Sequence, residues 1–482
     1  MAALSRRCSR FAAVGGIEAS FTPAPQHVPV LTMSLASANN CLLAPAIALG
    51  HPARERFDTS TGSRQGEKNA RPEPWRPVKL AVFRQRGLAA AVTAAVTALL
   101  ATAGLAFAGS AGGYTEQAKL AGRGETGNGN FGFSVAISAD GSTALIGGAQ
   151  DNSGVGAAWV FVRSGSTWTQ QGSKLTASDE SDGGTFGTSV ALSANGNTAL
   201  IGAYQENGQV GGAWVFTRSG SSWTQQGPML AASDESGAGE FGRSVALSAD
   251  GNTALISGNQ DSGFTGAAWV FTRSGSSWTQ QGSKLTASGE TSGGDFGFSA
   301  ALSADGNTAL IGGNNDGFGG ATWVFTRSGS TWTQQGSKLT ASDESGGGEF
   351  GYCVALAGDG NTALIGGPAN NNDVGASWVF TRSGSTWTQQ GPKLTASDES
   401  GFGLFGDCVA LAGDGNTALI GGNTDGNFGS CCVGAGAAWI FTRSGSTWTQ
   451  QGSKLSPSDE IGLGRFGSTV ALSADGSTAV IG

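Results

Sequence analysis

The sequence repeats one eighteen-residue segment seven times, and this repetition restricts the fold more than any other feature. The copy at residues 241–258 reads FGRSVALSADGNTALISG. The copies begin at Phe131, Phe186, Phe241, Phe296, Phe350, Phe405 and Phe466, at spacings of 55, 55, 55, 54, 55 and 61 residues. A period of this length predicts one supersecondary unit per copy, with neighbouring units stacked against each other.

Each unit is predicted to contain four short strands. In the third copy, apolar runs at residues 244–249 and 253–256 flank an Asp-Gly pair, which favours a tight hairpin turn. The segments GAAWVFTR at residues 266–273 and SWTQQG at residues 277–282 form a second hairpin around Ser-Gly-Ser. Two successive hairpins predict a four-stranded antiparallel sheet.

Such a sheet carries apolar residues on both faces, for example Val245, Leu255 and Trp269. A unit of about 55 residues cannot bury both faces by itself, so neighbouring units must cover it. A closed ring leaves no face uncovered, and we therefore predict an all-β, seven-bladed β-propeller over residues 109–482. A β-solenoid is the alternative, but its coils usually repeat at about half this length.

The Phe-Gly opening and the segments TALIGG, GAAWVF and WTQQGSKLTASDES resemble the FG-GAP repeat, the blade unit of integrin alpha-subunit propellers. They are most similar to the bacterial secreted branch of that family. The resemblance covers residues 114–482 and is specific because it recurs in register. It implies a seven-bladed propeller in an extracellular or envelope protein.

The seventh blade is predicted to be incomplete. Residues 114–120, YTEQAKL, match the fourth-strand text WTQQGSKL with one residue missing, and we expect them to close the ring by pairing into the last blade. The seventh copy ends at Gly482 after its first two strands, without a Trp-Val-Phe strand. A three-stranded blade or a truncated sequence would account for this, and we expect truncation.

Residues 78–108 are predicted to be a signal peptide that directs the chain to the cell surface or outside the cell. Basic residues at positions 79, 84 and 86 precede an apolar stretch, residues 88–108, that ends in Ala-Phe-Ala. The stretch is also long enough to span a bilayer, so an uncleaved membrane anchor is the alternative. Residues 1–77 are predicted to be disordered or an over-extended start of the reading frame.

The charge balance after residue 108 is 15 Lys and Arg against 30 Asp and Glu, which argues against a nucleic-acid partner. The only histidines, His27 and His51, lie outside the repeats. The repeats therefore contain neither a Ser-His-Asp triad nor a His-ligated metal, and we predict no catalytic residue.

The family resemblance raises the question of whether this chain binds calcium. Integrin-type repeats carry the loop Asp-x-Asp/Asn-x-Asp-Gly-x-x-Asp between the first two strands, where several oxygen ligands converge on one ion. This sequence has one acidic residue or Asn per loop at that point, namely Asp140, Asn195, Asp250, Asp305, Asp359, Asp414 and Asp475. We interpret these residues as turn formers and predict no metal site and no cofactor.

The loops between the second and third strands differ most between copies, and they are expected on the same face as the linkers between blades. Variation on a uniform scaffold is where a ligand preference can be encoded. We predict ligand binding by the acidic residues of these loops, Asp151, Glu206, Asp261, Asp316, Asp373 and Asp425.

The cysteines and tryptophans of the repeats are interpreted structurally. Twelve tryptophans, two in each of six copies, are expected to pack between sheets rather than to stack on sugars. Cys353 and Cys408 replace Ser in adjacent copies and are expected to lie too far apart for a disulfide. Cys431 and Cys432 could form a vicinal disulfide in an exported chain, with free thiols as the alternative.

Together these patterns predict a monomeric, non-enzymatic module at the cell surface or outside the cell that binds a protein or a glycan. Its only membrane contact would be an uncleaved anchor. A purely structural envelope component is one alternative, and a lyase or glycosidase that uses paired carboxylates is another. Catalysis would need unique polar residues, whereas nearly every acid of the repeats recurs in register.

Overall fold

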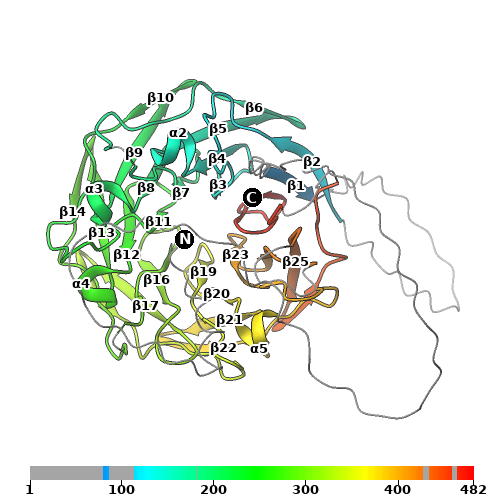
Figure 1. The fold of residues 1–482 in the computed structure, drawn as a ribbon. Helices are drawn as coiled ribbons and strands as arrows, with labels where there is room; N and C mark the ends of the chain where they lie inside the picture. Colours follow the sequence, from blue (N-terminus) through cyan, green and yellow to red (C-terminus); the bar gives the residue numbers. More distant parts are fainter. Residues whose placement is uncertain (1–79, 86–112, 182, 292, 427–433, 459–463) are drawn as a thin grey trace, which may run out of the picture. The chain divides into compact units, whose positions relative to one another are not determined.

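The computed structural model describes residues 80–85, 113–181, 183–291, 293–426, 434–458 and 464–482. These residues belong to one compact unit, in which antiparallel sheets follow one another around a common centre (Figure 1). No helix in these ranges is long and apolar enough to cross a membrane. The all-β propeller arrangement predicted from the repeats is confirmed, with six blades of four consecutive strands.

The first three of these sheets contain β3 (Ser134–Ile137), β4 (Thr143–Gly148), β5 (Ala157–Ser164) and β6 (Thr167–Gln170); β7 (Ser189–Leu192), β8 (Thr198–Ala203), β9 (Gly212–Ser219) and β10 (Ser222–Gln225); and β11 (Ser244–Leu247), β12 (Thr253–Gly258), β13 (Ala267–Ser274) and β14 (Ser277–Gln280). The next three contain β15 (Ser299–Leu302), β16 (Thr308–Gly313), β17 (Ala321–Ser328) and β18 (Thr331–Gln334); β19 (Cys353–Leu356), β20 (Thr362–Gly367), β21 (Ala376–Ser383) and β22 (Thr386–Gln389); and β23 (Cys408–Leu411), β24 (Thr417–Gly422), β25 (Ala437–Ser444) and β26 (Thr447–Gln450).

The second strand of each sheet is almost completely buried, because neighbouring sheets cover both of its faces. In β12, Leu255 packs into the same apolar cluster as Ile311 of the following sheet. The next residue, Ile256, packs into the cluster that contains Leu200 of the preceding sheet. Side chains alternate between the two faces of a strand, so a continuous apolar run suits a strand that is covered on both sides.

The Phe-Gly pair that opens each copy has two separate structural roles. Phe241 is fully buried, and its ring centroid lies 5.3 Å from that of Trp269 and 5.9 Å from that of Phe271 in the third strand of the same sheet. The backbone of Gly242 lies close to Gly202 in the preceding sheet. A Cβ atom on Gly202 would lie 2.3 Å from the Gly242 carbonyl oxygen. A larger residue at Gly202 would therefore push the sheets apart.

The residue before each Phe-Gly pair adopts a left-handed backbone conformation, although none of these residues is glycine. The φ angles lie between 53° and 64°. The residues are Asn130, Thr185, Glu240, Asp295, Glu349, Leu404 and Arg465. This conformation is unfavourable for residues other than Gly, Asn and Asp, so the packing of the following Phe side chain must stabilise it.

A further four-stranded sheet has the order β2 (Tyr114–Leu120), β1 (Leu80–Gln85), β28 (Thr478–Ile481) and β27 (Val470–Leu472). The sequence analysis expected no third strand here, and the structure instead places β1 between β2 and β28. Val82 pairs with Val480 in the same register as Val270 with Leu255 in the third copy. Residues 114–120 therefore pair with β1, which lies in the range assigned to a signal peptide.

Backbone hydrogen bonds join the turns after the innermost strands into a closed cycle. In each bond the amide of one residue donates to the carbonyl of its counterpart in the next sheet, at 2.9–3.0 Å. The cycle runs through Ala139, Ala194, Ala249, Ala304, Gly358, Gly413 and Ala474, and Ala474 donates to Ala139. Val480 of the last copy also packs into the cluster of Ile146 and Trp159 of the first.

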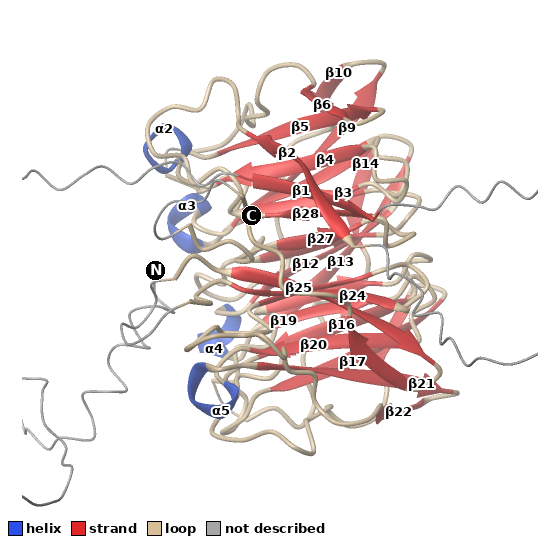
Figure 2. Cartoon of the chain, turned by 90° about the vertical axis from the view of Figure 1, so that its right-hand side faces the viewer, coloured by secondary structure: helices blue, strands red, loops and turns tan. Residues whose placement is uncertain are grey.

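Four short helical segments, α2 (Asp151–Gly154), α3 (Glu206–Gln209), α4 (Asp261–Phe264) and α5 (Asn370–Asp373), connect second strands to third strands where the sequence predicted loops. All four lie on one face of the sheets (Figure 2). We call this the loop face; it comprises residues 149–156 and 176–188 of the first copy and their counterparts. The opposite turn face comprises residues 138–142 and 164–167 and their counterparts.

Candidate functional site

Five of the acids predicted to bind a ligand are buried beneath the loop face. Their exposed fractions do not exceed 3%. They are Asp151, Glu206, Asp261, Asp316 and Asp425. The structure therefore places these carboxylates at equivalent positions of five copies, as expected, but inside the molecule.

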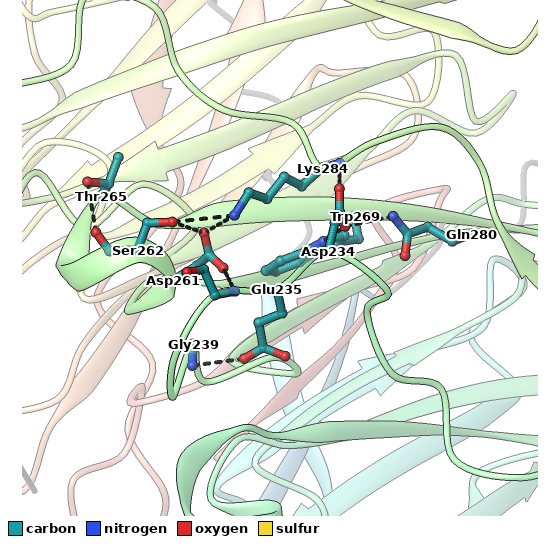
Figure 3. A network of polar contacts seen from close by, with 10 residues as sticks. Asp234, Glu235, Gly239, Asp261, Ser262, Thr265, Trp269, Gln280 and Lys284 are labelled. Atoms are coloured by element: carbon teal, nitrogen blue, oxygen red, sulfur yellow. Dashed lines mark hydrogen bonds and ion pairs between the residues drawn. The ribbon is translucent and has the colours of Figure 1, made fainter.

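The third copy shows what holds such a carboxylate (Figure 3). Lys284 donates to Oδ2 of Asp261 over 2.6 Å, and the backbone amide of Ser236 donates to Oδ1 over 2.6 Å. Ser262 donates to the same carboxylate over 2.8 Å. Asp261 thus connects the loop that contains it to the linker before the sheet and to the segment that follows the fourth strand.

The same ion pair recurs in three other copies, between Asp151 and Lys174, Asp316 and Lys338, and Asp425 and Lys454. In the fifth copy the buried position is held by Asn370, whose Oδ1 accepts from Lys393 over 2.8 Å. The predicted residue Asp373 lies three positions further on and is half-buried. Asp373 is therefore not the counterpart of the other five acids.

The second copy differs because its lysine position holds Met229. Glu206 replaces aspartate there, and its Oε1 accepts from the backbone amide of Ser181 over 2.9 Å. Its Oε2 atom is buried and has no hydrogen-bond partner. This copy therefore buries a carboxyl group without the cation that four other copies supply.

The linkers contribute a second set of structural acids. Asp234 accepts from the indole N–H of Trp269 and the backbone amide of Lys284, each over 2.8 Å. Burial raises the pKa of Asp234, but these hydrogen bonds outweigh that effect and hold the pKa below its ordinary value. Its neighbour Glu235 is half-buried, and desolvation raises its pKa to about 7.

Several large apolar side chains are exposed on the loop face. Within the described ranges, the exposed large hydrophobic residues are Phe133, Val210, Phe318 and Phe402, and all four lie on this face. Phe318 is the most exposed of them, at 80%. It borders a shallow pocket that Lys338 and Glu344 also line. These residues were not predicted from the sequence, although Phe318 and Phe402 depart from the repeat consensus.

Four further residues, which we call the inner arc, break the repeat beside the innermost strands. Arg243, Phe298 and Tyr352 each follow a Phe-Gly pair, and Tyr204 follows β8. The Arg243 guanidinium lies 4.4 Å from the ring centroid of Phe298 and 5.5 Å from that of Tyr204. The rings of Phe298 and Tyr352 are 4.9 Å apart. All four side chains are half-buried, so their outer surfaces remain accessible.

The tryptophans occupy two environments. Trp269 and its five counterparts in third strands are fully buried, which confirms the predicted packing role for this set. Trp278 in β14 is half-buried and donates to Gln226 of the preceding sheet over 3.0 Å. Arg273 lies 5.4 Å from its ring centroid. The outer tryptophans thus also take part in contacts between sheets.

The two cysteines of the inner strands are closer than the sequence analysis expected. The sulfur atoms of Cys353 and Cys408 lie 3.6 Å apart, and both thiols are free. The expectation that they are too distant for a disulfide is therefore wrong. Adjacent innermost strands approach closely because Gly residues line the contact, as Gly366 does against Gly406. Cys431 and Cys432 lie outside the described residues.

The Asp-Gly turns have the geometry expected of turn formers. Asp250 accepts from the hydroxyl of Ser248 over 2.6 Å and from the backbone amide of Asn252 over 2.9 Å. Within the described ranges, no group of three or more His, Cys, Asp or Glu side chains is placed to hold a metal ion. The prediction that calcium is not a cofactor stays a prediction.

The sheets, the cyclic contacts and the varied loop face define a repeat-built β-propeller. The family model of the FG-GAP repeat matches residues 168–216, 332–380 and 387–441, and each match runs from a fourth strand to the next third strand. These three segments of the chain are FG-GAP repeats. No match was found among curated proteins.

Two of the similar solved structures share little sequence identity with this chain. One is a candidate 6-phosphogluconolactonase from Bacteroides fragilis, with 13% identity, a TM-score of 0.48, and coverage of 79% of this chain and 95% of that chain. Another is the hydrazine synthase of Kuenenia stuttgartiensis, with 14% identity, a TM-score of 0.44, and coverage of 74% of this chain and 94% of that chain.

Proposed function

We propose that this FG-GAP propeller is a non-catalytic binding module whose ligand, a protein or a glycan, docks on the loop face. The observation that carries the proposal is the contiguous aromatic surface of the inner arc, in which the Arg243 guanidinium lies 4.4 Å from the ring centroid of Phe298 and that ring lies 4.9 Å from the ring of Tyr352. A contiguous, partly exposed apolar surface marks an interaction site. The buried ion pairs hold the loops in place, and the exposed residues between them provide the contact surface.

The inner arc supplies the part of this surface that is unique in the chain. Its aromatic rings and the Arg243 guanidinium are residue types that dominate binding energy at interfaces, because they bury a large area at low conformational cost. Phe298 and Tyr352 occupy a position at which other copies have Phe133, Thr188, Asp407 and Ser468, and only here do adjacent copies place Arg, Phe and Tyr in succession. We propose that the ligand is centred on this arc rather than on the buried acids.

We further propose that the propeller has seven blades and that the seventh is the sheet β2–β1–β28–β27. The cyclic hydrogen bonds and the register of Val82 against Val480 support this. In this arrangement residues from the N-terminal part of the chain close the ring.

The proposed location is outside the cell or at the cell surface, on the basis of the export pattern at residues 78–108. The fate of residues 78–108 affects the proposed seventh blade, because β1 lies inside this range. Cleavage after Ala108 would remove β1, whereas an uncleaved anchor would retain it. N-terminal sequencing of the purified native protein distinguishes these two forms.

The binding proposal is tested by screening the full chain against glycan and protein arrays, with and without calcium. Saturable binding that is lost in the variants Phe318→Ser and Tyr352→Ser supports a loop-face site. Ser276→Ala, an exposed substitution on the turn face, is the matched control and should leave binding unchanged. Binding that survives the loop-face substitutions and is lost in the control variant would contradict the proposal.

A further inference from the structure

We infer that Cys353 and Cys408 are a redox-active pair that forms a disulfide between the fifth and sixth sheets under oxidising conditions. The two residues begin β19 and β23, the innermost strands of adjacent sheets, and their sulfur atoms lie 3.6 Å apart. A disulfide has an S–S length of about 2.05 Å, so small side-chain rotations are enough to bring the sulfurs together.

In other copies, the residue at the position of Cys353 and Cys408 links one sheet to the next. Ser134 donates to the carbonyl of Gly187 in the next copy over 2.8 Å, and Thr469 donates to the carbonyl of Gly132 over 2.9 Å. Only two adjacent copies hold cysteine here. In them the hydroxyl bond between sheets is replaced by a contact between two thiols.

Each sulfur also accepts a hydrogen bond from a backbone amide. Val409 donates to Cys353 Sγ over 3.2 Å, and Val470 donates to Cys408 Sγ over 3.3 Å. Cys353 donates toward Cys408 Sγ over 3.6 Å. An amide donor favours the thiolate form of the sulfur that it contacts, so either cysteine can supply the attacking thiolate.

The oxidant in this reaction is a low-molecular-weight disulfide. One of the two cysteine thiolates attacks one sulfur of the reagent, the reagent S–S bond breaks, and one reagent thiolate leaves. The other cysteine then loses its proton and attacks the protein sulfur of the mixed disulfide, and the second reagent thiolate leaves. The protein loses two electrons and two protons, and the reagent disulfide becomes two thiols.

The product would bridge residues that are 55 positions apart in the chain. A loop of this length restricts the unfolded chain substantially, and we expect the thermal unfolding midpoint to rise by about 5 °C. Oxidation would thus lock two neighbouring sheets at their innermost strands.

The test treats the full chain with oxidised glutathione, blocks free thiols and digests the protein before Asp residues without reduction. Such a digest releases residues 343–358 and 407–413 as separate peptides, and places Cys431 and Cys432 in a third peptide. We expect the first two peptides to be joined, and dithiothreitol to separate them. Recovery of both peptides as blocked or singly glutathionylated species, without the joined product, would overturn the inference.

Two single variants provide the control. Cys353→Ser and Cys408→Ser should each stop at a glutathione adduct on the remaining cysteine, and neither should gain thermal stability after oxidation. Serine is the residue that other copies carry at this position, so both variants are expected to fold. A rise in the unfolding midpoint of either variant that equals the rise in the unsubstituted chain would overturn the inference.

Discussion

Lys284 donates to the carboxylate of Asp261 over 2.6 Å, and the Asp261 side chain is completely buried. The lysine follows the fourth strand of the sheet, and the aspartate begins the loop between the second and third strands. This pair therefore fixes the loop to the outer part of its own blade. The same relationship in three further copies explains why acids at the most variable loops are structural.

Removing the Asp261 carboxylate should leave Lys284 without its partner. We expect Asp261→Ala to lower the free energy of unfolding by about 3 kcal/mol. Asp261→Asn should cost only about 1 kcal/mol, because the fifth copy already uses Asn370 with Lys393 at this position. Urea denaturation of both variants is the measurement. Equal losses for Ala and Asn would show that the hydrogen bond to the lysine contributes little.

Met229→Lys should stabilise the protein, because it places a cation where five other copies have one. Glu206 is buried there and lacks the lysine partner. We expect a gain of about 1 kcal/mol in the free energy of unfolding at neutral pH, with Met229→Leu as the size-matched control. A gain of the same size in the leucine variant would assign the effect to packing and contradict the ion-pair explanation.

The backbone at Thr185 provides a third test. Its φ angle is 64°, a conformation that a β-branched residue adopts with difficulty. We expect Thr185→Asn to raise the free energy of unfolding by about 1 kcal/mol, because Asn tolerates this region. The first copy holds Asn130 in the same conformation, so Asn130→Thr should cost a similar amount. A loss of stability in Thr185→Asn, or a gain in Asn130→Thr, would contradict this explanation.

Stability should fall as pH rises through the range set by two half-buried glutamates. Burial raises the pKa of Glu235 and Glu290 from an ordinary value of 4.5 to about 7. Between these values the folded chain retains protons that the unfolded chain releases, so the free energy of unfolding decreases as pH rises from about 4.5 to about 7.

The double substitution Glu235→Gln and Glu290→Gln should flatten that dependence, because glutamine does not titrate. Urea denaturation at pH 5 and pH 7.5 measures the difference for the variant and the unsubstituted chain. Asp373→Asn, in a half-buried position on the same face, is the control. An unchanged pH dependence in the double variant would contradict the burial of these two carboxyl groups.

The sequence predicted the sheets well because their pattern is imposed by burial on both sides. The period, the Asp-Gly turns and the four strands of the third copy all follow from residues 241–282, and the boundaries differ by at most two residues. The short helical segments were not predicted, because residues such as Asn207 and Ser262 adopt left-handed angles that their composition does not indicate.

The burial of the loop-face acids was harder to predict, because the sequence of a variable loop does not distinguish an exposed acid from a buried one. The partner lysines carried a usable signal, since Lys174 and Lys284 each lie 23 residues after their aspartates. Strand β1 was missed because LAVFRQ shares only Val-Phe with WVFTR, and it adjoins an apolar stretch that favours a signal peptide. The distance between Cys353 and Cys408 depends on contacts between sheets that no local pattern specifies.

The central structural claim is that the innermost strands of the first and seventh copies lie next to each other. Ser134 and Thr469 hold the positions that Cys353 and Cys408 hold in the fifth and sixth copies. The measurement is the rate of oxidative cross-linking of Ser134→Cys with Thr469→Cys in a chain whose native cysteines are replaced by serine. The account predicts cross-linking as fast as that of the adjacent pair Ser134→Cys with Ser189→Cys. Cross-linking as slow as that of the non-adjacent pair Ser134→Cys with Ser299→Cys would contradict a closed ring.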